Sequence, residues 1–174
     1  MTKFTPPSSV TTQMSKIYYA LATDLPLLAM LKSKSKFFDE VKEIEFADFE
    51  IDTNDMDFWK LVDHHIQFAE KDSKIVDEKL NRIYIYTGRR VPVFGNSFVV
   101  KQYFEINIIV HEDFTPDYRL ERISDRVNQI LLHNRISGFG KIGYHMGEPY
   151  QAPREFQTYK HIYYFNDRSK TLCY

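Results

Sequence analysis

The chain has one cysteine and no long apolar run, and each shortage excludes a class of protein. Cys173 is the only cysteine in 174 residues, so no disulfide within the chain is possible and the thiol reads as an incidental one in a reducing compartment. The most apolar stretch, Ile17 to Leu31, is interrupted by Asp24 and Pro26 and is too short to cross a bilayer. It follows a polar start that contains Pro6, Pro7, Ser8 and Ser9, and we expect no secretory signal. We therefore expect no membrane partner and a protein made and used in a cytoplasm.

Excess charge of one sign is also lacking. The net charge is −1 and the pI is about 6.6, which disfavours a general nucleic-acid binder. Aromatic residues make up 16% of the chain, and strand tyrosines can stack bases, but the glycine-aromatic signature of an RNA-recognition strand is missing. Acidic residues gather between Asp39 and Glu78, whereas basic residues modestly prevail from Arg82 onward. Such asymmetry suits head-to-tail packing of subunits, and chance explains it equally well.

Motifs for metal, cofactor or catalytic chemistry are missing as well. The neighbours His64 and His65 would point about 100° apart on a helix, and no His-Glu-x-x-His or cysteine pair is present. Gly138-Phe139-Gly140 follows a predicted helix, so it is better explained as a helix end than as a phosphate-binding turn. The sequence also lacks a Gly-x-Ser-x-Gly elbow. We predict a non-enzymatic protein without cofactor.

The first 79 residues predict helices and an acidic elaboration. One helix should run from Thr11 or Thr12 to Ala22, and Asp24 should cap a second that has Pro26 in its first turn. Residues 36–55 fit either an exposed strand or an acidic loop. A third helix should start at Asn54 or Asp55 and end near residues 71–73, because four apolar side chains share one helical face. These four are Phe58, Val62, Ile66 and Ala69.

Residues 80–174 predict a sheet with one long helix. Strands are expected at residues 82–87, 98–111, 141–148 and 155–166, and the loop between the first two would carry Arg89 and Arg90. The helix is expected from Asp117 to Ile136, with Arg119 on its polar face and a stop at residues 137–140. The fold class is therefore α+β: a mostly antiparallel sheet with one amphipathic helix packed on it, preceded by N-terminal helices. We expect both parts to form one compact domain.

Three stretches of this pattern resemble neck proteins of tailed bacteriophages. They are the run Asp24-Leu25-Pro26-Leu27-Leu28, the strand Arg82-Ile83-Tyr84-Ile85-Tyr86, and the strand that ends Phe104-Glu105-Ile106-Asn107-Ile108-Ile109-Val110. The stretch from Arg119 to Leu131 is similar to the single core helix of that group, and the closing tyrosine-rich strand also fits. The chain thus resembles tail terminator (tail completion) and related head–tail joining proteins over about residues 80–166, plus the short helix near Asp24.

The resemblance implies a structural virion protein, assembled in the bacterial cytoplasm, without cofactor or catalytic residue. Copies would form a closed ring, commonly a hexamer, that ends the tail tube and joins it to the head connector. The candidate subunit contacts lie in the predicted loop, the long strand and the last strand: Arg89, Arg90, Tyr103, Glu105, Tyr159 and Tyr163. The alternative is a small protein-interaction or ligand-binding domain of α+β type unrelated to phage, and an enzyme of unrecognised chemistry is the least favoured reading.

Overall fold

A computed structural model describes residues 10–35, 52–69, 79–133, 136 and 141–168. Its main helices are α1 (Val10–Ala22), α2 (Leu25–Lys32), α3 (Met56–His65) and α4 (Arg119–Asn128). A 3-10 helix, η3 (Glu112–Asp117), precedes α4, and a π-helical turn, η4 (Gln129–His133), follows it. The strands are β1 (Ile66–Gln67), β2 (Arg82–Val93), β3 (Asn96–His111), β4 (Gly143–Pro149) and β5 (Phe156–Arg168).

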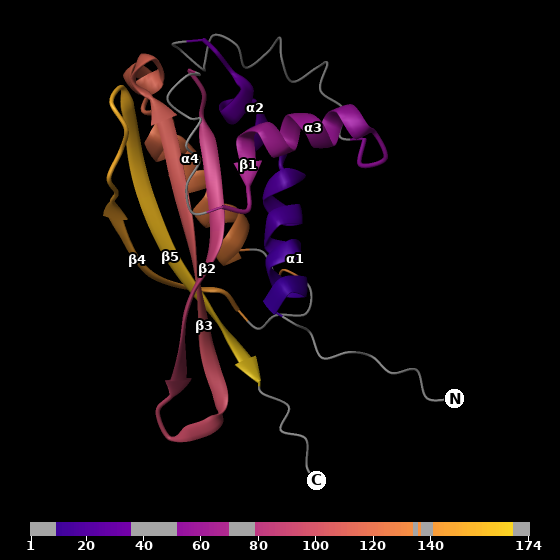
Figure 1. Cartoon of the computed structure of the whole chain (residues 1–174), viewed down its shortest axis with the longest axis vertical. Coiled ribbons are helices and arrows are strands. Elements are labelled where there is room, and N and C mark those ends of the chain that lie inside the picture. Colours follow the sequence, from indigo (N-terminus) through magenta and orange to yellow (C-terminus); the bar gives the residue numbers. More distant parts are fainter. Residues whose placement is uncertain (1–9, 36–51, 70–78, 134–135, 137–140, 169–174) are drawn as a thin grey trace.

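The strands form one sheet in the order β1-β2-β3-β5-β4. Only the pairing of β1 with β2 is parallel, and the other three pairings are antiparallel. The helices lie on one side of the sheet (Figure 1). The predicted α+β class, with a mostly antiparallel sheet and preceding helices, is therefore confirmed.

The alternation of side chains along the strands explains why one face of the sheet is covered by helices. Ile83 and Ile85 of β2 and Phe104, Ile106 and Ile108 of β3 lie in one apolar cluster with side chains of α1 to α4. The period of two in a strand sends every second side chain to that cluster and the others to the opposite face, which we call the outer face. The cluster takes side chains from before and after residue 79.

The caps of two N-terminal helices lie where the sequence predicts. The Asp24 side chain accepts a hydrogen bond from the Leu27 backbone N–H at 3.0 Å, and Asp55 accepts one from Asp57 at 2.9 Å. Asp24 also binds both Nε and an amino nitrogen of Arg126, at 2.9 and 2.7 Å. This two-point contact ties the start of α2 to α4.

The third helix is shorter than predicted. It ends at His65, and Ile66, which we expected on its apolar face, begins the two-residue strand β1. The cause is a tertiary contact: Ile66 pairs with Ile83 of β2 and is fully buried there. His65 is held beside it by a 2.9 Å hydrogen bond between its Nδ1 and the Asn81 carbonyl oxygen. The expected end of the helix, at residues 71–73, and the acidic stretch 36–51 fall outside the described residues.

The long helix also differs from its prediction. It begins at Arg119, after Tyr118 in the left-handed region (φ 58°), and Asp117 belongs to the preceding 3-10 helix. Arg119, expected on the polar face, is fully buried, and its guanidinium binds the Asp117 carboxylate and the carbonyls of Met30, Ser33 and Ser35 at 2.8–3.3 Å. The regular α-helix ends at Asn128, and the predicted stop at 137–140 lies outside the described residues.

Candidate functional site

Arg89 and Arg90 lie in a strand and not in the predicted loop. β2 continues to Val93 and turns into β3 at Phe94 and Gly95, where Gly95 adopts a φ of 77°. A register shift between Thr87 and Arg90 marks a bulge at Gly88, where an added Cβ would lie 3.3 Å from Glu105 Oε1. The sequence misled because Gly88 and Pro92 are typical turn residues, yet both are tolerated in a bulged edge strand.

This hairpin is the most prominent surface feature of the chain. Its far half, residues 87–101, runs past the helix layer, and we call it the hairpin end (Figure 1). Phe94 at the turn is fully exposed, and Arg89 and Arg90 are exposed as well. The Arg89 guanidinium lies 5.1 Å from the centroid of the Tyr103 ring, and Arg90 donates a hydrogen bond to the Gln102 side chain. The two arginines are therefore oriented by their neighbours on β3.

The outer face carries a polar network around Glu105. Glu105 accepts a 2.7 Å hydrogen bond from the Tyr86 hydroxyl and lies 3.6 Å from Lys160 Nζ. Lys160 also pairs with Glu148 of β4 at 2.9 Å. Burial, followed by the bond to Glu105, raises the pKa of Tyr86 above its ordinary value. Tyr103 and Glu105 thus share one face, and the ring of Tyr103 also contacts the exposed His145 with centroids 5.0 Å apart.

The two candidate residues on the last strand lie on the helix-covered side of the sheet. Tyr163 has no exposed surface and donates a 2.7 Å hydrogen bond to Asn128 of α4. Tyr159 is half-buried, and its ring lies tilted against His161 with ring centroids 4.9 Å apart. The six candidates therefore divide into four on the outer face and the hairpin end, of which only Arg89 and Arg90 are exposed, and a pair on the side covered by α4. A contribution of Tyr163 to a subunit contact would have to act through Asn128 and α4.

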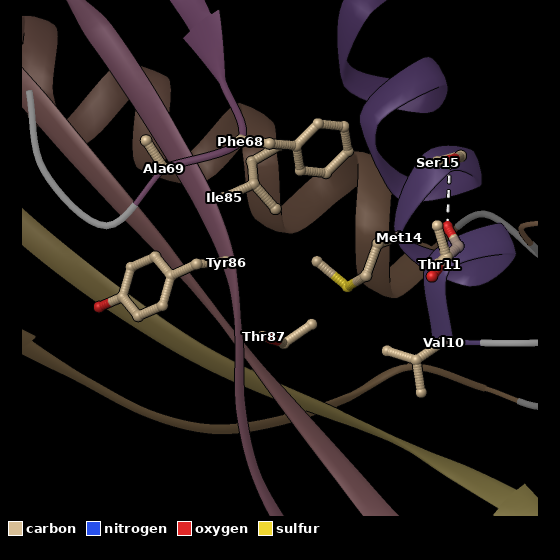
Figure 2. A pocket seen from close by; sticks show the side chains of 9 residues that line it. All are labelled: Val10, Thr11, Met14, Ser15, Phe68, Ala69, Ile85, Tyr86 and Thr87. Carbon is tan, nitrogen blue, oxygen red and sulfur yellow. Dashed lines mark hydrogen bonds between the residues drawn. The ribbon is translucent and has the colours of Figure 1, made fainter.

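A pocket of about 320 Å³ lies between α1 and the free edge of β2. Met14 of α1 faces Ile85 and Thr87 across it, whereas Tyr86 points away to the outer face (Figure 2). Phe68 closes one side, and its ring stacks on Tyr18 at 4.8 Å. In the described part of the chain, β1 is the only strand that pairs with this edge, and its two residues leave β2 from Ile85 onward unpaired on that side.

A second pocket, of about 350 Å³, lies between α4 and the strands β4 and β5. Its lining includes Glu121 and Asp125 of α4 together with Tyr144, Tyr159 and His161 of the sheet. No local pattern joins residues 121–125 to residue 161, so sequence reasoning had no signal for this pocket.

The described residues contain neither a candidate metal centre nor a helix that could span a membrane. Among the described residues, no three or more histidine, cysteine, aspartate or glutamate side chains are grouped so that they could hold a metal ion. Of the helices in the same residues, none is long and apolar enough to span a membrane. The hairpin end, the outer face and the two pockets are the candidate binding surfaces in the described part of the chain.

These features define the class of protein: an α+β chain in which helices cover one face of an antiparallel sheet and a hairpin extends from it. A family model, YomW, matches residues 24–165, so the chain belongs to the YomW family. The family is named from a gene of a phage region in Bacillus, which indicates a phage-related protein. No curated protein matches the chain.

Proposed function

We propose that the chain is a structural virion protein of a tailed phage that forms a closed hexameric ring at the head-proximal end of the tail. There it ends the tail tube and joins it to the head connector. Membership in a phage-related family supports the phage part of this proposal and disfavours a domain unrelated to phage. The ring, the tail and the neck rest on the resemblance together with the surfaces described above.

The observation that carries the proposal is the hairpin end. A solvated hairpin with Phe94 at its tip exposes an aromatic ring of a size that proteins usually bury in cores or interfaces. Arg89 and Arg90 lie beside it, and arginine and aromatic residues are enriched in protein–protein interfaces. A projecting element that meets a different surface on the next copy makes a head-to-tail contact, and such contacts close into rings.

The outer face offers the partner side of such a contact. Glu105 and Glu148 bring two carboxylates to it, and Lys160 lies between them. The arginines of one hairpin end can meet acidic groups of an adjoining subunit, which steers association and fixes its register. The proposal requires neither catalysis nor cofactor, and it places the protein in the virion after assembly in the bacterial cytoplasm.

Charge reversal on the hairpin end tests the proposal. Wild-type protein should sediment as a closed oligomer, or assemble on purified tail tubes seen by electron microscopy. The double variant Arg89→Glu, Arg90→Glu should weaken this assembly by about tenfold or more, because the contact loses two cations and gains two repelling anions. Sedimentation velocity over a wide concentration range and tube binding give the two readouts.

A matched control is Lys60→Glu. Lys60 is an exposed cation on α3, 70% exposed in its side chain and paired only with its helical neighbour Asp57 at 2.7 Å among the described residues. It should assemble like the wild type. Wild-type protein that remains monomeric at every concentration and ignores tail tubes would remove the ring proposal. Unaffected assembly of the double variant would instead remove the hairpin end from the interface.

A further inference from the structure

The pocket under α4 combines acidic groups that have no cation of their own. Glu121 and Asp125 are four residues apart and therefore on one face of α4, where like charges repel. Both are exposed at the mouth of the pocket, and among the described residues neither has an ion pair. The nearby Arg126, which could have neutralised them, is bound to Asp24 and Gln129.

A buried histidine lies in the wall of the same pocket. His161 is 3% exposed, and its Nδ1 lies 3.1 Å from the Tyr144 hydroxyl. Its Nε2 is buried and has no hydrogen-bond partner in the described structure. A buried polar atom without a partner is costly and calls for an explanation. Burial lowers the pKa of His161 to about 4, and Asp125 opposes this shift, so the ring is neutral near pH 7.

Two tyrosines complete the pocket. Tyr144 is 41% exposed at its mouth, and Tyr159 lies between β4 and α4 with its ring against His161. Aromatic faces attract cations, and hydroxyl oxygens accept hydrogen bonds from N–H groups. Among the described residues, the lining thus offers two carboxylates, two aromatic rings and a neutral imidazole, and it includes no lysine or arginine. An anionic ligand finds no complementary charge there.

We propose that this pocket binds a positively charged nitrogen group, a guanidinium or an alkylammonium, between the carboxylates of α4 and the aromatic wall of β4 and β5. The carboxylates hold the charge, and Tyr144 and Tyr159 contact the face or the edge of the cation. A donor N–H that reaches His161 selects the tautomer in which Nδ1 carries the proton and donates to the Tyr144 oxygen, leaving the Nε2 lone pair as acceptor. Nε2 is buried, so the side chains around it shift to admit the cation while the contact between Nδ1 and Tyr144 is kept.

The test uses methylguanidinium and methylammonium as probes and N-methylurea as the uncharged match of the first. Nitrogen-15 spectra of the full-length protein follow the ring nitrogens of His161 during each titration. Both cations should cause saturable shifts that move the Nε2 resonance toward a hydrogen-bonded acceptor, and N-methylurea should cause none. A diffuse ion atmosphere would leave Nε2 unchanged, which separates a built site from simple charge attraction.

Variants of the two carboxylates sharpen the result. Asp125→Asn and Glu121→Gln should each weaken cation binding by about tenfold, since each removes one charge from the site. Both positions are exposed, so the fold should survive, and the amide spectrum checks this. Asp57→Asn is the control, because Asp57 is an exposed helical carboxylate on α3, 81% exposed in its side chain. Equal affinity in wild type and Asp125→Asn, or no saturable shift in wild type, overturns the proposal.

The cation can come from free solute or from an arginine or lysine side chain of an adjoining copy. Sedimentation with methylguanidinium, compared with sodium chloride at equal ionic strength, separates these sources. If methylguanidinium dissociates the oligomer and sodium chloride does not, the natural cation is a side chain of a second copy. If methylguanidinium binds without changing the assembly, the natural cation is a free solute. The proposal goes beyond the ring: a monomeric protein that still binds the probes would contradict the ring and leave the pocket intact.

Discussion

Strand β2 has two halves that differ in environment, although both consist largely of residues that favour sheets. Its first half, Arg82 to Ile85, is buried, and Ile83 and Ile85 pack under the helices. Its second half, from Thr87 to Val93, is exposed or half-exposed and continues into the hairpin end. One strand therefore serves the core at one end and the surface at the other.

The difference in burial between the two halves predicts which substitutions lower stability and which weaken assembly. Substitutions in the helix-covered half remove buried contacts and should lower the free energy of unfolding. Substitutions in the hairpin end remove few contacts within the chain and should act on association. A variant that violates this division in either direction would show that the two halves are coupled.

The largest effect should come from Arg119 of α4, which is fully buried in the helix layer on the covered side of the sheet. Replacing Arg119 by Met removes the guanidinium that donates to the buried Asp117 carboxylate and to the carbonyl oxygens of Met30, Ser33 and Ser35. We expect a loss of about 3–5 kcal/mol in the free energy of unfolding, measured by urea denaturation. Adding Asp117→Asn to this variant should recover part of the loss, because it removes the buried negative charge that Arg119 balanced.

Arg89→Met is the matched control for Arg119→Met. The same substitution on the hairpin end should change the free energy of unfolding by less than about 0.5 kcal/mol, because Arg89 is exposed. Similar losses for the two variants would mean that burial does not separate the halves as described.

Lowering the pH should have the next largest effect on the free energy of unfolding, and it should act through two buried histidines. Burial lowers the pKa of His65 and of His161 from 6.5 to about 4. Because the unfolded chain binds protons first, the stability that these neutral rings give is complete above pH 6.5 and is lost as the pH falls toward 4. Between pH 6.5 and pH 5 each histidine should cost about 1.5 kcal/mol. Urea denaturation at several pH values measures the slope.

The slope of the free energy of unfolding against pH, and not the free energy itself, shows which histidine causes the effect. His161→Phe should reduce the dependence on pH over this interval, whatever it does to stability at pH 7. His145→Gln is the matched control, because it replaces a histidine that is exposed on β4. An unchanged slope in His161→Phe would show that this histidine titrates alike in the folded and unfolded chain.

Local chemistry made part of the structure predictable. The caps at Asp24 and Asp55 and the strand that ends at His111 follow from side chains adjacent in sequence. Ile66 was assigned to the helix because an apolar residue is buried equally well on a helical face and in a parallel strand. Its pairing with Ile83, which is distant in sequence, places it in the strand. Arg119 is charged, so the sequence predicts a solvated side chain. Its burial depends on hydrogen bonds to backbone carbonyls that follow α2, which the local sequence does not indicate.

The candidate contacts were harder to predict because they depend on which strands are neighbours. Tyr103 and Glu105 share the outer face, as alternation along one strand implies. Tyr159 and Tyr163 face α4 instead, since the register that pairs Phe104 with Tyr163 places the two on the covered side. That register depends on long-range pairing, which composition and spacing in a single strand do not encode.

The smallest effect on stability is expected at the tip of the hairpin, where the effect on assembly should be largest. Phe94→Ser removes a ring that is fully exposed, so the free energy of unfolding should change by less than about 0.5 kcal/mol. If the ring is an anchor in a partner pocket, the same change should weaken assembly by about thirtyfold or more, since a buried aromatic anchor contributes about 2 kcal/mol or more. Sedimentation and tube binding measure the second effect, and urea denaturation measures the first. Phe68→Ser provides the contrast, because Phe68 is also exposed but stacks on Tyr18 beside α1. Loss of stability without loss of assembly at Phe94 would reverse the division between the two halves of β2.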